Sequence, residues 1–191
     1  MALRKLTDAT VEPVTLAEAK AHLNIQTADH DAYLPSLITA ARTAAEGKLN
    51  RSLIDTSWEL TLDAFPSAIP LRMAPVISVA SVKYIDTAGT QQTLAAPSYL
   101  VDDRSEPGWI VPAYGYQWPT VRDQINAVTV VYHAGYGSDA TKVPEPIKWW
   151  IKAQLAAMFA NRSAVEVDRG IVVVELGFVD HLLDPYLLVE L

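Results

Sequence analysis

Apolar residues recur with a helical period over two long stretches of the chain. In residues 29–51 they fall three or four positions apart, which places them on one face of a helix. Asp29 or Asp31 can accept hydrogen bonds from its first backbone N–H groups, and Pro35 is tolerated so early in a helix. The alanines on the face allow close approach, so a second helix over residues 144–162 is predicted to pack against it. The apolar face of the first helix consists of Leu34, Leu37, Ile38, Ala41, Ala44, Ala45 and Leu49.

The second long helix has clear signals at both ends. Pro144 and Pro146 stand at its start, where proline costs little. Trp149 lies off its apolar stripe and either fills a junction with a sheet or is exposed for a partner. An Asn-Arg-Ser sequence follows both long helices, and asparagine tolerates the left-handed conformation that often ends a helix. We therefore expect Asn50 and Asn161 to end their helices in the same way. The stripe consists of Ile147, Trp150, Ile151, Leu155, Met158 and Phe159.

A shorter helix is predicted before these two, over residues 16–23. Thr15 and Glu18 have the spacing of a capping box at its start. Two such helices joined by a turn could form a DNA-binding helix-turn-helix, which needs basic and amide side chains near the start of its second helix. Here that start is acidic, and the only cations of the helix are Arg42 and Lys48. Two helices that simply pack together are the favoured interpretation.

Between the helices, over residues 56–134, the apolar period changes to alternation, which indicates strands. Gly89 can take the positive φ of a hairpin turn between the second and third strands. The last strand, residues 127–133, is apolar on both faces and is predicted to lie in the middle of a sheet. The predicted strands cover residues 56–62, 76–85, 91–94, 99–102, 109–111 and 127–133.

These elements predict an α+β fold with a single domain over residues 1–191. A helical body, made of two N-terminal helices and a long C-terminal helix, covers residues 14–51 and 144–162. A mainly antiparallel β-module, residues 56–134, is inserted into it.

An apolar C-terminal tail, residues 163–191, follows the last helix. Residues 164–167 and 171–176 flank Asp-Arg-Gly like a hairpin, and a largely apolar run continues almost to the end of the sequence. So much apolar surface must be covered, either by the same chain or by exchange with a neighbouring copy, and the sequence leaves both open. The tail contributes four candidate interface residues, which are Phe178, Leu182, Leu183 and Tyr186.

The formal net charge of -7 and the absence of cysteine exclude several classes of protein. An acidic chain is poorly suited to gripping phosphate backbones, although DNA could slide past it. Disulfides, thiolate zinc sites and cysteine nucleophiles are excluded. The N-terminus is too polar for a signal sequence and no apolar run is long enough to span a bilayer, so we expect neither secretion nor a membrane partner.

No constellation of catalytic, metal-binding or cofactor-binding residues emerges from the sequence. The four histidines are widely separated, and the run Asp29-His30-Asp31 is more typical of a helix start than of a cation site. Asp102 and Glu106 place two carboxylates on one loop, which is the only hint of acid/base chemistry. The sequence therefore predicts no enzyme, no metal and no cofactor, with a hydrolase using these two carboxylates as a remote alternative.

Four aromatic residues fall within ten positions of the β-module, broken by glycine and proline. We expect them to lie on a loop, where exposed aromatic rings anchor protein interfaces or stack on sugars. Packing under the loop, an interface and sugar binding all remain open. The four are Trp109, Tyr114, Tyr116 and Trp118, and together with Trp149 and the tail residues they form the set of candidate interface residues.

Several short motifs along the chain occur in an order that is similar to that of a known family. The similarity begins with the run from Pro13 to Leu23, continues through Ala40-Ala41-Arg42 to Asn50-Arg51, and includes Trp58-Glu59-Leu60. Further matches are Phe65-Pro66, Pro75-Val76, Ser81-Val82-Lys83-Tyr84, the run from Tyr132 to Gly137, Val143-Pro144, Ile147-Lys148, Asn161-Arg162 and Leu182-Leu183-Asp184-Pro185-Tyr186. The order of these motifs resembles the head-tail connector (adaptor) proteins of tailed bacteriophages. In that family an arginine often follows the tyrosine, whereas this chain has Leu187.

The resemblance implies a structural virion protein of a phage or prophage, located at the head-tail junction after assembly in the host cytoplasm. It implies a homo-oligomeric ring beneath the portal protein, which extends the DNA channel and docks the tail or stopper protein. DNA would pass through without specific binding. A closed ring needs a heterologous interface, so each subunit would use two different faces. The alternative function is a carbohydrate- or receptor-binding phage component that uses the aromatic loop.

Overall fold

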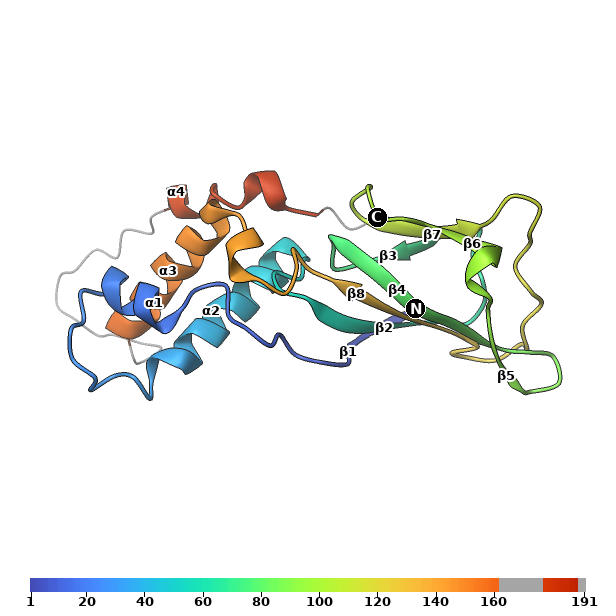
Figure 1. Cartoon of the computed structure of the whole chain (residues 1–191), viewed down its shortest axis with the longest axis horizontal. Coiled ribbons are helices and arrows are strands. Elements are labelled where there is room, and N and C mark those ends of the chain that lie inside the picture. Colours follow the sequence, from blue (N-terminus) through green and yellow to red (C-terminus); the bar gives the residue numbers. More distant parts are fainter. Residues whose placement is uncertain (162–176, 189–191) are drawn as a thin grey trace. The chain divides into compact units, whose positions relative to one another are not determined.

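The computed structural model describes residues 1–161 and 177–188, apart from the side chain of Phe178. It confirms an α+β class with antiparallel sheets. The predicted hairpin over residues 164–176 lies outside the described residues. The chain forms two compact units, of which unit 1 comprises Met1–Thr10 and Asn50–Ser138 and unit 2 comprises Val11–Leu49 and Asp139–Leu191. Unit 1 holds the sheets, and unit 2 holds the helices (Figure 1).

Unit 1 is built on a five-stranded antiparallel sheet with the order β1-β2-β8-β4-β5. The prediction that the last strand lies in the middle is confirmed, because β8 has β2 on one side and β4 on the other. Its residues alternate between buried and half-buried positions, as expected for a central strand. The strands are β1 (Ala2–Lys5), β2 (Thr56–Leu62), β4 (Val76–Ile85), β5 (Gln91–Thr93) and β8 (Val128–Ala134).

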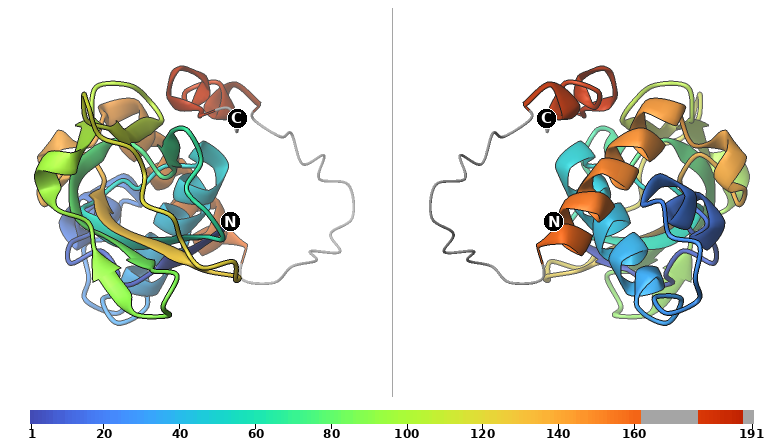
Figure 2. Two further views of the ribbon diagram at one scale, coloured as in Figure 1. Left: turned by 90° about the vertical axis from the view of Figure 1, so that its right-hand side faces the viewer. Right: turned by 90° about the vertical axis from the view of Figure 1, so that its left-hand side faces the viewer.

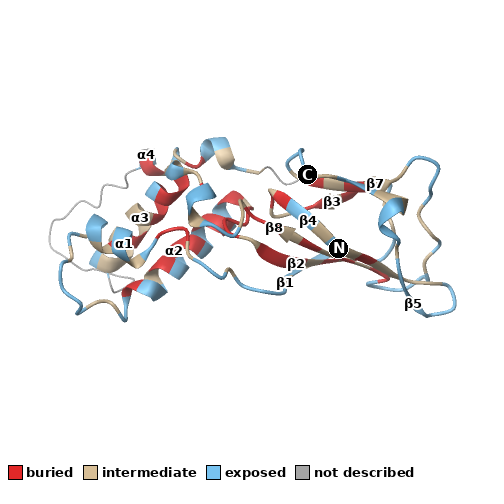
Figure 3. Ribbon diagram, viewed as in Figure 1, coloured by how far each residue is buried: buried red, intermediate tan, exposed pale blue. Residues whose placement is uncertain are grey.

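A second, three-stranded antiparallel sheet supplies the other half of the core of unit 1. Its order is β3-β7-β6, with β3 (Ile69–Leu71), β7 (Gly108–Pro112) and β6 (Tyr99–Asp102). Leu60 of the first sheet and Ile110 of the second are both fully buried in one apolar cluster. Each such side chain contributes about 2 kcal/mol to folding. Figure 3 shows this cluster as the red core of the strands.

The predicted hairpin between β4 and β5 is confirmed, and Gly89 takes the expected positive φ of 88° in its turn. The Asp86 carboxylate accepts hydrogen bonds from the Gln92 amide and the Thr90 N–H, which lower the pKa of Asp86. Strands β1 and β3 were not predicted. The segment of β1 is too short and polar to show alternation, and β3 is interrupted by Pro70, which pairs at the edge of its sheet.

Unit 2 packs three helices, α1 (Leu16–His22), α2 (Leu34–Leu49) and α3 (Glu145–Ala160), against one another (Figure 2). The two longer helices, α2 and α3, lie against each other. The capping box of α1 is also confirmed, because the Glu18 N–H donates to the Thr15 hydroxyl over 3.2 Å and the Thr15 N–H donates to the Glu18 carboxylate over 2.7 Å. No helix in the described part of the chain is long and apolar enough to span a membrane.

Two predictions about helix ends are wrong. The first long helix begins at Leu34, not at Asp29, because the preceding residues form turns and Asp31 instead accepts a hydrogen bond from Lys20 Nζ over 2.6 Å. Asn50 has the predicted left-handed φ of 54°. Asn161 does not, since its φ is −110° and its amide donates to the Ala157 carbonyl over 3.2 Å. The two long helices therefore end in different ways.

Candidate functional site

Among the residues that the structure describes, the most exposed aromatic side chain lies on a tight turn that follows β7. The Tyr116 N–H donates to the Ala113 carbonyl over 2.9 Å, and Gly115 has a φ of 81° at the third position of the turn, which glycine adopts without strain. The Ala113 N–H donates to the Ser98 carbonyl over 3.0 Å, so the turn is fixed to the segment before β6. Tyr114 is fully exposed and Tyr116 is 54% exposed. The backbone therefore holds two tyrosines in solvent.

The other two members of the aromatic cluster lie in packed positions. Trp118 stacks on Phe65 with ring centroids 4.7 Å apart, and its indole nitrogen is buried without a hydrogen-bond partner among the described residues. Trp109 lies on β7 and is half-buried, so the expectation that all four residues lie on a loop is wrong for it. The cluster therefore divides into two packed tryptophans and two exposed tyrosines. We call the turn that carries the two tyrosines, Ala113–Tyr116, the tyrosine turn.

The rest of the long segment between β7 and β8 is held at several points. The Arg122 N–H donates to the Ile85 carbonyl over 3.0 Å, and the Asn126 N–H donates to the Asp63 carboxylate over 2.8 Å. Asn126 has a positive φ of 56°, which asparagine tolerates. These bonds hold the segment in place while Ile125 remains 77% exposed. A segment whose backbone is already ordered loses little conformational entropy when a partner binds to it.

The two carboxylates proposed for acid/base chemistry have structural partners instead. Asp102 accepts a hydrogen bond from the Ser105 hydroxyl over 2.6 Å and others from the backbone of Arg104 and Ser105. These bonds lower the pKa of Asp102, whereas a general acid needs a raised pKa. Glu106 accepts from Arg51 Nη2 over 2.5 Å. Both carboxylates therefore stabilise the β6–β7 loop and its surroundings.

Trp149 of α3 faces solvent in the described structure and is 43% exposed. The edge of its ring approaches His22 of α1, with centroids 6.4 Å apart. Trp149 therefore lies at the surface of unit 2.

The described part of the C-terminal tail lies on the helices of its own chain. It comprises α4 (Gly177–Asp180) and a 3-10 turn, Asp184–Tyr186. Val179 and Leu183 are buried, Leu182 and Tyr186 are half-buried, and Leu187 is 43% exposed. The side chain of Phe178 lies outside the described residues. Of the predicted tail residues, Leu183 thus serves packing within unit 2.

One carboxylate fastens this tail segment to two helices. Asp180 accepts from the Trp150 indole N–H over 2.9 Å and forms an ion pair with Lys48 Nζ at 2.7 Å. The hydrogen bonds from Lys48 and then Trp150 lower the pKa of Asp180. Further along, the Leu188 N–H donates to the Leu49 carbonyl over 3.2 Å. We call this group of contacts the tail clasp.

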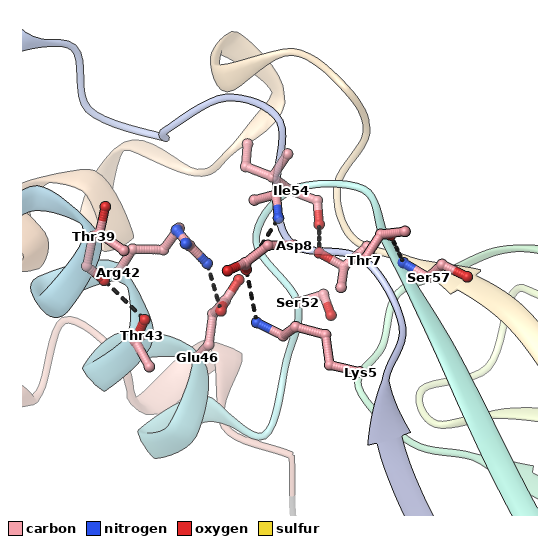
Figure 4. Close-up of polar contacts among 12 residues, drawn as sticks. Lys5, Thr7, Asp8, Thr39, Arg42, Thr43, Glu46, Ser52, Ile54 and Ser57 are labelled. Carbon is pink, nitrogen blue, oxygen red and sulfur yellow. Dashed lines mark hydrogen bonds and ion pairs between the residues drawn. The ribbon is translucent and has the colours of Figure 1, made fainter. Parts of the chain in front are cut away.

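Unit 2 also contains a buried cation that the sequence did not reveal. Arg42 is only 2% exposed and donates to Glu46 over 3.0 Å and to Glu12 over 2.8 Å. Figure 4 shows the Arg42–Glu46 pair on α2 and, separately, the hydrogen bond from the Ser57 N–H to the Thr7 hydroxyl. Because Arg42 is buried, it is not available to bind DNA. A charged residue within an apolar stripe was the only sequence signal for this site.

Residues 13–96 match the model of a family described as phage gp6-like head-tail connector protein. The resemblance to head-tail connectors is confirmed. The matched region contains α1 and α2 of unit 2 and strands β2 to β5 of unit 1. A comparison with curated proteins found no match.

The chain is also similar in fold to chains of three solved assemblies of a gene transfer agent (GTA). These are the neck of an empty GTA particle computed with C6 symmetry (23% identity, TM-score 0.81), the virion of a native GTA particle (24%, 0.80) and the neck of a native GTA particle computed with C12 symmetry (24%, 0.78). Each alignment covers 100% of this chain and 97% of the other. At these identities the likeness shows the fold.

Proposed function

We propose that this chain is the connector subunit of a tailed phage or prophage, and that copies of it form a ring under the portal protein. The ring extends the DNA channel and docks the tail or stopper protein, and the chain has no enzymatic activity. The family match over residues 13–96 carries this proposal. The fold shared with chains of the GTA necks supports it, because those necks were computed with C6 and C12 symmetry.

The charges of the chain suit a passage that DNA crosses without being held. Acidic residues outnumber basic ones by 22 to 15. Three of the cations, Arg42, Arg51 and Lys148, are buried and ion-paired, so they are withdrawn from any contact with phosphates. A negative wall repels the DNA backbone and prevents it from sticking.

The tyrosine turn and Trp149 are proposed docking points on this connector. Ordered aromatic side chains in solvent are typical anchors of protein interfaces. The same two tyrosines support the rival function, in which a phage component binds carbohydrate or a receptor through stacked rings. The packing of Trp109 and Trp118 weakens that rival, since only two of the four rings are well exposed.

Electron microscopy of the purified full-length chain, alone and mixed with its portal protein, tests the proposal. The connector reading predicts closed rings that cap the portal, either preformed or assembled on it. The double variant Tyr114→Ala, Tyr116→Ala should change assembly or tail docking. On a glycan array, the wild-type chain and the variant should both show only background binding of carbohydrate. A chain that neither forms rings nor binds the portal, and whose tyrosines are needed to bind a glycan, would overturn the proposal.

A further inference from the structure

The five-stranded sheet of unit 1 leaves an open backbone edge on one side. Within the described part of the chain, the edge strand β5 pairs only with Lys83–Ile85 of β4, and the Leu94 N–H donates to the Val82 carbonyl just beyond it. Residues 76–81 of β4 pair with β8 on one side. On their other side no strand of the described chain pairs with them. Their outward N–H and C=O groups are therefore in position to accept another strand.

This open edge of β4 lacks charged side chains. Three residues of its sequence, Val-Ile-Ser-Val-Ala-Ser, are β-branched and favour strands, and Ile77, Ser78 and Ala80 are exposed. Proteins usually protect such an edge with lysine, proline or a bulge. Here two register shifts, between Val76 and Ser78 and between Val79 and Ser81, are the only such device. Figure 3 shows the early part of β4 in the colour of exposed residues.

Apolar surface continues from this edge onto the second sheet. A Cβ atom placed on Gly108 would lie 2.7 Å from a Val76 methyl group and 2.9 Å from the Asp102 carbonyl oxygen. The start of β4 and the end of β6 are therefore adjacent. On β6, which is itself an edge strand, Leu100 is 58% exposed and Val101 is 36% exposed. One side of unit 1 thus presents two unpaired edges with apolar side chains.

The opposite side of the same sheet ends in β1, which pairs only with β2 in the described chain. Apolar residues flank β1 on both ends, because Met1 is 57% exposed and Leu6 is 41% exposed. Within β1, Leu3 packs against the core of unit 1 and Arg4 forms an ion pair with Glu59 on the other face. The sheet therefore has two open edges, and both carry exposed apolar side chains.

We propose that β1 of one copy adds to residues 77–81 of β4 in the next copy, so that the sheets join head to tail around the ring. This inference rests on the proposed ring. Strands alternate in direction from β1 through β2 and β8 to β4, so β1 and β4 run in opposite directions. The rotation between neighbours in a large ring is small and does not reverse a strand. The new pair is therefore antiparallel and continues the alternation without a break.

The side chains of the two edges match face by face. Leu3 and Val79 both pack against the core cluster, so both lie on the inner face of their sheets. Arg4 and Ser78 lie on the outer face, since Ser78 pairs with His133, whose neighbour Tyr132 points into the core. Joining the edges places apolar beside apolar on the inner face and polar beside polar on the outer face. The join is heterologous, as a closed ring requires.

Cysteine cross-linking of the full chain tests this pairing, because the natural sequence has no cysteine. In the double variant Arg4→Cys, Ser78→Cys, oxidation of rings formed alone or on the portal should link most chains into a ladder on a non-reducing gel. Reductant should collapse the ladder to monomer, and either single variant should stay monomeric. The matched control is the double variant Arg4→Cys, Thr93→Cys. Thr93 lies on β5, an exposed strand on the same side of the sheet as the open edge of β4, and this variant should give no ladder.

The outcomes separate this inference from the connector role. Rings that are visible by electron microscopy but give no ladder, or a ladder only with Thr93→Cys, overturn the β1–β4 pairing and leave the connector role intact. A wild-type chain that forms no ring on the portal contradicts both. A second variant, Ser78→Lys, should abolish ring formation with an unchanged circular dichroism spectrum, whereas Thr93→Lys should still form rings. Rings formed equally by both lysine variants would also overturn the pairing.

Discussion

Trp150 donates its indole N–H to the carboxylate of Asp180 over 2.9 Å, and this bond joins α3 to a segment 30 residues further along the chain. Lys48 of α2 reaches the same carboxylate, and its ammonium lies 5.8 Å from the centre of the Trp150 ring. The carboxylate therefore ties three elements of unit 2 together. Because it is half exposed, solvent weakens each of these interactions.

Replacing Asp180 with asparagine should loosen the tail clasp while unit 2 stays folded. The loss should be about 1 kcal/mol or less, because a half-exposed ion pair contributes little. The indole resonance of Trp150 in a 15N–1H NMR spectrum should move, and Trp150→Phe identifies that resonance. Asp184→Asn, which removes an exposed partner of His181, is the control and should leave the resonance in place. An unmoved resonance in Asp180→Asn would contradict the clasp.

The same clasp should depend on pH in a defined direction. Hydrogen bonds from Lys48 and Trp150 lower the pKa of Asp180 in the folded state. The stabilisation is therefore complete above the ordinary carboxyl pKa of about 4 and is lost as the pH falls through the lowered pKa. The Trp150 indole resonance should titrate with a midpoint below the ordinary pKa of a carboxyl group. A midpoint at or above the ordinary value would show that the bonds do not favour the charged carboxylate.

Removing the buried cation Arg42 should strongly destabilise unit 2. Arg42→Met deletes the charge that balances the buried Glu46 carboxylate, and breaking a buried pair costs about 3–5 kcal/mol. The double change Arg42→Met, Glu46→Leu removes both charges and should cost much less. Urea unfolding measures both, with the exposed Lys142→Met as the control. Equal losses in the single and double variants would mean that shape, not charge balance, sets the requirement.

Three glycines should respond to alanine in three different ways. At Gly135, φ is 141° and a Cβ atom would lie 2.5 Å from the Ile54 carbonyl, so the cost should be about 3 kcal/mol or more. At Gly115, φ is 81° but the space is open, so strain alone should cost about 1 kcal/mol. At Gly47 in α2 the space is open and alanine favours a helix, so stability should rise by about 0.5–1 kcal/mol. Thermal unfolding of the three variants should give this order, and a different order would contradict these contacts.

How far the sequence predicted this structure depends on whether a signal was local. The alternation of β2, the apolar β8 and the turn at Gly89 were all visible in the sequence, because side-chain period and turn chemistry are local properties. The capping box at Thr15 was visible for the same reason. The start of α2 was missed because Asp31 is engaged by Lys20, which is a tertiary contact.

The candidate site was predicted less completely than the fold. The sequence placed four aromatic residues together but could not show that Trp118 stacks on Phe65, 53 positions away in the chain, while Tyr114 projects. The ion pairs of Arg42 with Glu12 and of Arg51 with Glu106 join residues 30 and 55 positions apart. Such pairs follow from packing, and no local pattern marks them. The edge strand β1 was missed because an exposed strand of four residues has little apolar signal.

The tyrosine turn should matter for assembly and not for stability. Tyr114→Ala removes a fully exposed ring, so the free energy of unfolding should change by less than about 0.5 kcal/mol. Trp118→Ala removes a stacked, packed ring and should cost about 2 kcal/mol or more. Binding of the variant rings to the portal and to tails, measured by sedimentation, should fall for Tyr114→Ala. Unchanged binding by Tyr114→Ala would show that the tyrosine turn is not part of the docking surface.

Electron microscopy of a lysate from phage that lack this gene tests the connector role most directly. The role predicts filled or leaking heads without attached tails, together with free tails, and restoration of complete particles when the gene is supplied from a plasmid. Normal particles with attached tails would contradict the role and would move the aromatic binding function to first place.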